Sequence, residues 1–560
     1  MDVSTRRSMA QSGGPHRGNR ITPPLQKDSA EKLKRRRKPK GENLNLKPAK
    51  TDLPPSTTRK ATCGPAPRLN PIFFRQGRRS LSVLAALVGF VCAGFSAPRS
   101  HPPDVLFIIS EDLATCMGSY GNPVCQTPNL DALAASGVRF DNAQCMFPVC
   151  NPTRSSFLSG LYPRTTQVLG NAQDWNENLK PGTTLPEYFR ANGYLTMRCG
   201  KIFHAGNGAR DFSDIARWDM VLPESAIAAG EGGGGKKGGK KGSGRGGAQV
   251  QRQETWLYSD LTPEQRNNEY DTRAWVWGPV GTEDTDHPDG RIAAQAVKVL
   301  RAKQEKPLFL ALGFHKTHLP LFAPKKYFDL YPPEKMPLPN YAENCLEGLP
   351  HGYSLKNHKA FTDEKRRQAI AAYYASASYM DACVGRVLNA LKETGRDRNT
   401  IVVFMGDHGF HMGEHLLWQK MTLFEESSRV PLIIRAPGVT PAGSICKRPV
   451  SQIDLYPTLA DLCGLGAPSG LEGISMAPLL RDPNRPWKKG AFTTMGNGTS
   501  VRTERYRYNE WGGPEQAELY DHESDPRELR NLAKDPKFKE VVTELSALIK
   551  GGWKAALPAP

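Results

Sequence analysis

Cys150 and Arg154 lie four residues apart in a Cys-Asn-Pro-Thr-Arg segment, which continues through serines and a leucine to Gly160. A cysteine is a candidate nucleophile, and a guanidinium is a permanent cation that binds anionic oxygens in a fixed fork. The segment therefore indicates nucleophilic attack beside an anion-binding group. The competing interpretation is structural, with Cys150 in a disulfide bridge to Cys145.

Two acidic pairs directly follow apolar runs of the kind that form buried strands. Glu111 and Asp112 follow residues 104–110, and Asp407 precedes His408 after residues 401–406. Acids after strands are also common turn and cap residues, so neither pair alone is strong. Placed at one edge of a sheet, however, they supply the oxygen ligands that hard divalent cations prefer. Together with Cys150 they predict a metal site.

Lysine and histidine side chains recur in three further clusters, at residues 200–204, 315–320 and 406–420. Any one of them would more often be a surface or core residue. A tetrahedral oxyanion needs donors on several sides, however, and a departing alkoxide needs an acid within hydrogen-bond reach. The candidates for these roles are Lys201, His204, His318 and Lys420.

The elements that must position these residues alternate between strand and helix patterns. Strand patterns occupy residues 104–110, 308–313 and 401–406, and helix patterns occupy residues 128–137, 292–303 and 364–394. This alternation predicts an α/β catalytic domain over residues 100–450 with a large, mostly parallel sheet flanked by helices. We expect a helix near residues 451–462, strands at 501–508 and 518–521, and a helix at 538–548, which predict a smaller antiparallel-sheet subdomain over residues 451–560.

The net charge of +19 comes from two segments that lack the composition of a folded core. Residues 1–79 carry a net charge of +15, and residues 230–249, within a Gly/Lys-rich insert at 228–249, carry +4. Both segments are expected to be flexible, the first as a disordered basic tail. Because the remainder is electrically balanced, no basic face for a nucleic acid is indicated.

Residues 81–95 form an apolar and small-residue run of 15, after Arg78-Arg79 and before Ser-Ala-Pro. The run is shorter than the roughly 20 residues that span a bilayer, so residues 80–97 are predicted to be a signal peptide. We expect an exported protein, periplasmic or extracellular, without stable membrane insertion after the signal is removed. Because the run begins far from residue 1, translation is expected to start near Leu69 or Ile72.

These motifs jointly resemble those of the type I sulfatases of the alkaline phosphatase superfamily, and among them the iduronate-2-sulfatases, over residues 102–535. The resemblance implies an alkaline phosphatase-like fold. It also implies that a formylglycine-generating enzyme converts Cys150 to formylglycine, and that one calcium ion is held by Glu111, Asp112, Cys150, Asp407 and His408. One departure is Glu111, where the family usually has aspartate, and another is Thr317 in place of proline.

The resemblance further implies the reaction and the role of each side chain. Sulfate esters of sugars or polysaccharides would be hydrolysed through a formylglycine hydrate and a sulfo-enzyme intermediate. Arg154 would hold the hydrate and sulfate, Lys201 and His204 would orient and deprotonate the hydrate, and His318 and Lys420 would bind sulfate and assist the leaving oxygen. A phosphonate monoester hydrolase or phosphodiesterase of the same superfamily is the alternative enzyme. A polyanion-binding protein, suggested by the basic tail, is the alternative from another class.

Overall fold

The structure is a computed structural model that describes residues 101–205, 212–224 and 275–558. The predicted basic tail (1–79), signal peptide (80–97) and Gly/Lys insert (228–249) lie outside the described residues. Among the helices of the described ranges, none combines the length and the apolar composition needed to cross a bilayer.

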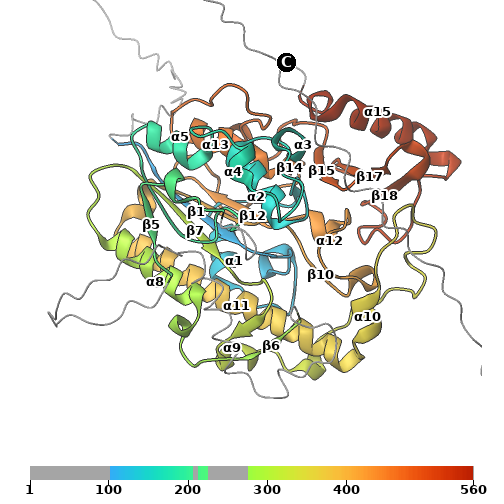
Figure 1. Cartoon of the computed structure of the whole chain (residues 1–560), viewed down its shortest axis with the longest axis horizontal. Helices are drawn as coiled ribbons and strands as arrows, with labels where there is room; N and C mark the ends of the chain where they lie inside the picture. Colours follow the sequence, from blue (N-terminus) through green and yellow to red (C-terminus); the bar gives the residue numbers. More distant parts are fainter. Residues whose placement is uncertain (1–100, 206–211, 225–274, 559–560) are drawn as a thin grey trace, which may run out of the picture. The chain divides into compact units, whose positions relative to one another are not determined.

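A mixed sheet organises the part of the chain that precedes residue 450 (Figure 1). In the order β13-β2-β12-β9-β1-β7-β4-β5, the neighbours from β9 to β5 are parallel, whereas β12 is antiparallel to both β9 and β2. The α/β prediction with a mostly parallel sheet is therefore confirmed. The strands are β1 (Asp104–Ser110), β2 (Val138–Phe140), β4 (Leu195–Gly200), β5 (Met220–Leu222), β7 (Leu308–Phe314), β9 (Thr400–Gly406), β12 (Leu432–Arg435) and β13 (Ser444–Cys446).

Helices cover both faces of this sheet, which explains why its central strands are continuous apolar runs rather than alternating ones. Along β1, Val105, Phe107 and Ile109 join one buried cluster, and Leu106 and Ile108 join the other. Figure 1 shows helices α8 and α11 on one side of the sheet and α2, α5 and α13 on the other. The larger helices are α1 (Pro128–Ala135), α2 (Cys150–Ser159), α5 (Leu185–Ala191), α8 (Pro288–Arg301), α11 (Asp363–Glu393) and α13 (Leu455–Leu462).

The expected helix over residues 451–462 begins later than predicted. Residues 450 and 451 form strand β14 (Val450–Ser451) beside β3 (Ala143–Gln144), and a 3-10 turn then leads into α13. Ser451 donates its backbone N–H to the Asp454 carboxylate over 2.8 Å. This capping interaction keeps the first residues out of the α-helix.

The C-terminal region forms a four-stranded antiparallel sheet covered by a long helix, and the predicted antiparallel sheet is confirmed. The expected single strand over residues 501–508 is wrong, because the chain reverses between Arg502 and Tyr506. Thr503 Oγ1 accepts the backbone N–H of Tyr506 over 2.9 Å, a local bond that stabilises a turn. The elements are β15 (Ala491–Met495), β16 (Gly498–Arg502), β17 (Tyr506–Trp511), β18 (Ala517–Asp521) and α15 (Lys539–Ala555).

The remaining strands and α-helices of the described residues are short. They are β6 (Trp277–Pro279), β8 (Leu321–Ala323), β10 (His411–Met412), β11 (Trp418–Gln419), α3 (Pro163–Thr166), α4 (Trp175–Asn178), α9 (Lys325–Phe328), α10 (Lys356–Ala360), α12 (Glu425–Ser428) and α14 (Ala477–Arg481).

Candidate active site

The candidate residues gather at the carboxyl edge of the parallel strands. Strand β1 ends at Ser110, which pairs with Gly406 of β9 on one side and with Phe314 of β7 on the other. Parallel strands that stop in register deliver the next residues to one edge. Glu111 and Asp112 therefore lie beside Asp407 and His408.

Cys150 is the first residue of α2 and is buried against this edge. Its Sγ lies 3.4 Å from Glu111 Oε1 and 3.4 Å from His408 Nε2, and Lys420 Nζ donates to it over 3.2 Å. Burial raises the pKa of the thiol to about 12, although the nearby lysines oppose the shift. An unmodified Cys150 is thus a neutral thiol at neutral pH and a poor nucleophile.

The alternative disulfide between Cys145 and Cys150 is wrong. Both residues are free cysteines, as are the other cysteines that the structure describes. Cys145 instead directs its Sγ to the carbonyl oxygen of Ser427, at 3.9 Å. Cys150 is consequently available for chemistry.

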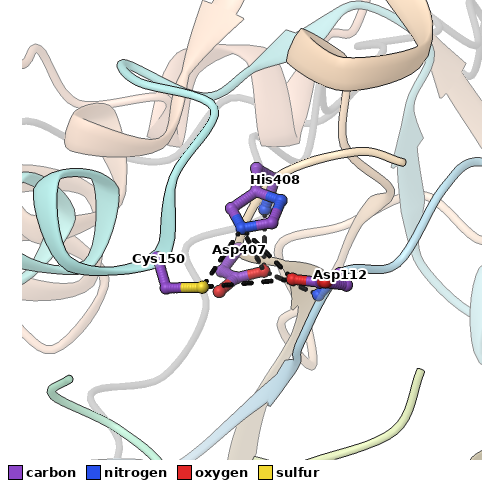
Figure 2. A group of neighbouring side chains, drawn as sticks. All are labelled: Asp112, Cys150, Asp407 and His408. Atoms are coloured by element: carbon purple, nitrogen blue, oxygen red, sulfur yellow. Dashed lines mark hydrogen bonds and ion pairs between the residues drawn. The ribbon is translucent and has the colours of Figure 1, made fainter. Parts of the chain in front are cut away.

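Asp112, Cys150, Asp407 and His408 form a compact group whose ligand atoms all lie within 4.8 Å of one another (Figure 2). His408 places Nδ1 3.0 Å from the carbonyl oxygen of Gly409, which fixes the proton on Nδ1 and leaves Nε2 as the ligand atom. Burial opposes ionisation of Asp407, but His408 and Arg154 lower its pKa to about 2. Two carboxylates and an imidazole are a donor set that fits a divalent cation.

Glu111 lies beside this group, in a second one with Asp112 and His318. Its carboxylate forms an ion pair with Lys201, and His318 Nε2 lies 3.9 Å away. Burial alone would raise the pKa of Glu111, but Lys201 and the other cations hold it well below its usual value. The same Oε1 atom of Glu111 therefore faces both Lys201 Nζ and Cys150 Sγ.

Arg154 is fully buried and connects α2 to two neighbouring segments. Its Nε donates to Asp407 Oδ2 over 3.0 Å, and its Nη1 donates to the carbonyl oxygens of Lys201 and Ile202, at 2.5 and 3.0 Å. Nη2 has no hydrogen-bond partner among the described residues. A buried guanidinium with an uncommitted N–H is suited to an anionic oxygen of a ligand.

Lys420 and His204 approach the same point from other segments. Lys420 Nζ lies 2.6 Å from Asp112 Oδ1; burial disfavours its charge, but the surrounding carboxylates raise its pKa above the usual value. His204 is buried, and neither ring nitrogen has a partner within the described ranges. Burial and the charge of Lys201 lower the pKa of His204 to about 3, so its imidazole is neutral at neutral pH.

Two residues that support the site, Tyr373 and Gln452, were not predicted from the sequence. Tyr373 of α11 donates its hydroxyl to the carbonyl oxygen of Asp112 over 2.6 Å and holds that residue at a φ of 57°. Gln452 donates Nε2 to the carbonyl oxygen of Gly406 over 2.6 Å and accepts Thr153 Oγ1 over 2.9 Å. Both lie in buried segments, where a polar side chain carries no local sign of its partner.

A partly buried ion pair near His318 is expected to make stability depend on pH. His315 Nε2 lies 3.0 Å from Glu224 Oε2, with 18% and 20% of the two side chains exposed. Burial alone would lower the pKa of His315, but Glu224 raises it from 6.5 to about 9. The ion pair therefore adds up to ~3 kcal/mol to the free energy of unfolding. This contribution is complete below pH 6.5 and is lost as pH rises through about 9.

Glu224→Gln should remove that loss. Urea unfolding from pH 6 to pH 9.5 should show the free energy of unfolding falling less in the variant than in the parent, with the largest difference between them at low pH. Glu393→Gln is the matched control, because Glu393 pairs with Arg301 at an exposed site, where ion pairs contribute little. An identical pH dependence in Glu224→Gln and the parent would contradict the assignment.

Comparison with known proteins finds matches that cover most of the chain. A family model described as Sulfatase matches residues 103–465, and one described as N-sulphoglucosamine sulphohydrolase, C-terminal, matches residues 413–552. A sulfatase of Formosa agariphila is 34% identical over 80% of this chain and 86% of its own. The iduronate 2-sulfatase of Mus musculus is 30% identical over 70% of this chain and 74% of its own.

A solved structure of similar fold holds its substrate, D-glucosamine-2-N,6-O-disulfate. It superimposes with a TM-score of 0.61 at 20% identity, over 81% of this chain and 98% of that protein. At this identity the likeness concerns the fold.

Proposed function

Since the chain belongs to the type I sulfatase family of the alkaline phosphatase superfamily and is a sulfuric ester hydrolase, we propose that it removes sulfate from a sulfated sugar or polysaccharide, using formylglycine made from Cys150. The observation that carries this proposal is the convergence of Cys150 with Arg154, Lys420 and the Asp112–Asp407–His408 group at one buried edge. The names of the relatives, iduronate 2-sulfatase and N-acetylglucosamine-6-O-sulfatase among them, support a sulfated carbohydrate.

The side chains around position 150 have different roles in ester cleavage. As its hydrate, formylglycine supplies an attacking hydroxyl and a second hydroxyl whose deprotonation releases sulfate. Arg154 Nη2 and the ammonium groups of Lys201 and Lys420 bind the sulfuryl oxygens and offset their charge. His204, whose buried ring nitrogens have no partner among the described residues, would accept the proton of the second hydroxyl once the hydrate is in place.

His318 is the candidate for delivering a proton to the departing sugar oxygen. Its side chain is 40% exposed, unlike the buried groups around Cys150, so it can reach a bulky carbohydrate from the open side of the site. Its Nδ1 lies 2.6 Å from the carbonyl oxygen of Leu319, which orients the ring, and in the imidazolium form Nε2 would give its proton to the leaving oxygen.

We assign the divalent site to calcium, held by Asp112, Asp407, His408 and position 150, with Glu111 alongside. The ion would supply Lewis-acid polarisation of the sulfuryl oxygens. Calcium at about a hundredfold excess over its Kd should raise the midpoint of thermal unfolding by roughly 1–4 °C. Differential scanning fluorimetry with calcium and magnesium in parallel measures this shift.

Asp112→Asn should lose the calcium shift, because it removes one carboxylate from the ligand group. Asp381→Asn should keep it, since Asp381 is a buried carboxylate that binds the Asn129 side chain and the backbone N–H groups at the start of α1. An equal shift in parent and Asp112→Asn would place the ion elsewhere.

The proposal includes maturation and export before the enzyme acts. A formylglycine-generating enzyme would modify Cys150, and the signal segment at residues 80–97 would direct the chain out of the cytoplasm. Peptide mass spectrometry on protein from the native host should find formylglycine at position 150 and an N-terminal peptide that begins after residue 97.

Parallel assays separate the proposed reaction from its closest rival. We expect turnover of an aryl sulfate to exceed turnover of an aryl phosphonate ester at least about a hundredfold in kcat/KM. A preference for the phosphonate, with Cys150 unmodified, would overturn the proposal.

A further inference from the structure

A segment that the mechanism does not use, residues 169–175, is fastened to the start of α2. Asn151 is fully buried, and its Nδ2 donates to the carbonyl oxygens of Gly170 and Gln173, at 3.0 and 2.8 Å. The backbone N–H of Asn151 also donates, to Asn171 Oδ1 over 3.0 Å. Three hydrogen bonds thus join this segment to the residue that follows Cys150.

The bond from Asn151 to Asn171 replaces a missing helix cap. Val149 occupies the N-cap position of α2, and its apolar side chain makes no capping hydrogen bond. The first N–H groups of a helix have no partner within the helix, and an asparagine oxygen is among the best acceptors for them. Asn171 supplies that oxygen from a different part of the chain.

The other end of the segment is fastened to the backbone of His204. Trp175 is fully buried, and its Nε1–H donates to the carbonyl oxygen of His204 over 2.9 Å. Its indole also stacks on Phe203, with ring centroids 4.1 Å apart and an interplanar angle of 18°. The stretch after β4 that carries Lys201 and His204 therefore rests on the same segment as α2.

We infer that residues 169–175 form a strap that sets the position of residue 150 relative to His204, with Asn151, Asn171 and Trp175 as positioning residues. The inference rests on the proposed function, in which these two residues work on one reacting group. Arg154 also joins α2 to Lys201 and Ile202 through Nη1, so the strap acts together with that link. A misplacement of about 1 Å between reacting groups can cost roughly a hundredfold in rate, so the strap should act on kcat.

Paired variants separate positioning from packing. Asn171→Ala removes the acceptor for the Asn151 N–H, whereas Asn171→Asp keeps an acceptor and adds a negative charge that a helix N-terminus favours. Trp175→Phe keeps an aromatic ring on Phe203 and removes the hydrogen bond to His204, together with part of the indole that lies against Arg217. Asn178→Ala is the matched control, because Asn178 Nδ2 binds the carbonyl oxygen of Thr166 and contacts neither α2 nor His204 through a hydrogen bond.

Steady-state kinetics, corrected for formylglycine content by mass spectrometry, should distinguish the variants that lose positioning from those that keep it. Asn171→Ala and Trp175→Phe should each lower kcat about tenfold with KM changed less than about twofold, because substrate contacts are retained. Asn171→Asp and Asn178→Ala should stay within about threefold of the parent. Equal loss in Asn171→Ala and Asn178→Ala would overturn the inference.

Hydrogen–deuterium exchange provides a test that needs no catalytic activity. If the strap is one device, Asn171→Ala should accelerate exchange in peptides that cover residues 150–154 and also in those that cover residues 200–204. Acceleration confined to residues 150–154 would overturn the inference. Failure of the proposed function would appear separately, as a parent enzyme that releases no sulfate while the exchange results hold.

Discussion

Replacing Cys150 with alanine is expected to abolish sulfate release, with kcat reduced by about 10⁴-fold or more. The side chain is the only proposed source of the attacking group, and loss of a nucleophile removes the covalent route altogether. The fold should persist, because alanine is well tolerated at the first residue of α2 and the site loses only one buried sulfur atom. Aryl sulfate turnover and far-UV circular dichroism measure the two effects.

Cys145→Ala provides the matched control for this variant. Cys145 is also fully buried, and its Sγ contacts only a backbone carbonyl oxygen among the described hydrogen bonds. It should retain activity within about threefold. Sulfatase turnover that survives in Cys150→Ala would refute the assignment of the nucleophile.

Replacing Asp407 with asparagine should lower both activity and stability. Oδ1 accepts the backbone N–H groups of Asp112 and His408, each over 2.9 Å, and Oδ2 accepts Arg154 Nε over 3.0 Å. Asparagine keeps only one of the two acceptor oxygens. The buried Arg154 guanidinium also loses the negative charge that neutralises it. We expect a destabilisation of about 3–5 kcal/mol and a loss of activity of about 10³-fold or more.

Asp381→Asn tests whether the effect is specific to the site. Asp381 is equally buried and binds N–H groups, and burial raises its pKa to about 6, so its charge is less firmly held than that of Asp407. Its replacement should cost less in urea unfolding and leave kcat within about threefold. Comparable losses of activity in both variants would show that Asp407 acts through general stability.

The sequence by itself determined the sheet and its chemical edge. Continuous apolar runs before Glu111 and Asp407 marked strands buried on both faces, and the alternation with helices made the sheet mostly parallel. Connectivity then requires acidic pairs after such strands to meet. The spacing of Cys150 and Arg154 is likewise local, because one helical turn separates them.

Only the tertiary structure decided which distant groups complete that edge. The hydrogen bonds from Tyr373 to Asp112 and from Trp175 to His204 join residues remote in sequence, and no period of apolar residues encodes them. The turn at Thr503 was not predicted, because the residue alternation of β16 continues into β17 and therefore looks like one strand. Charge states were also undecided, since the pKa of Cys150 and that of His204 depend on burial and on cations brought near by the folded chain.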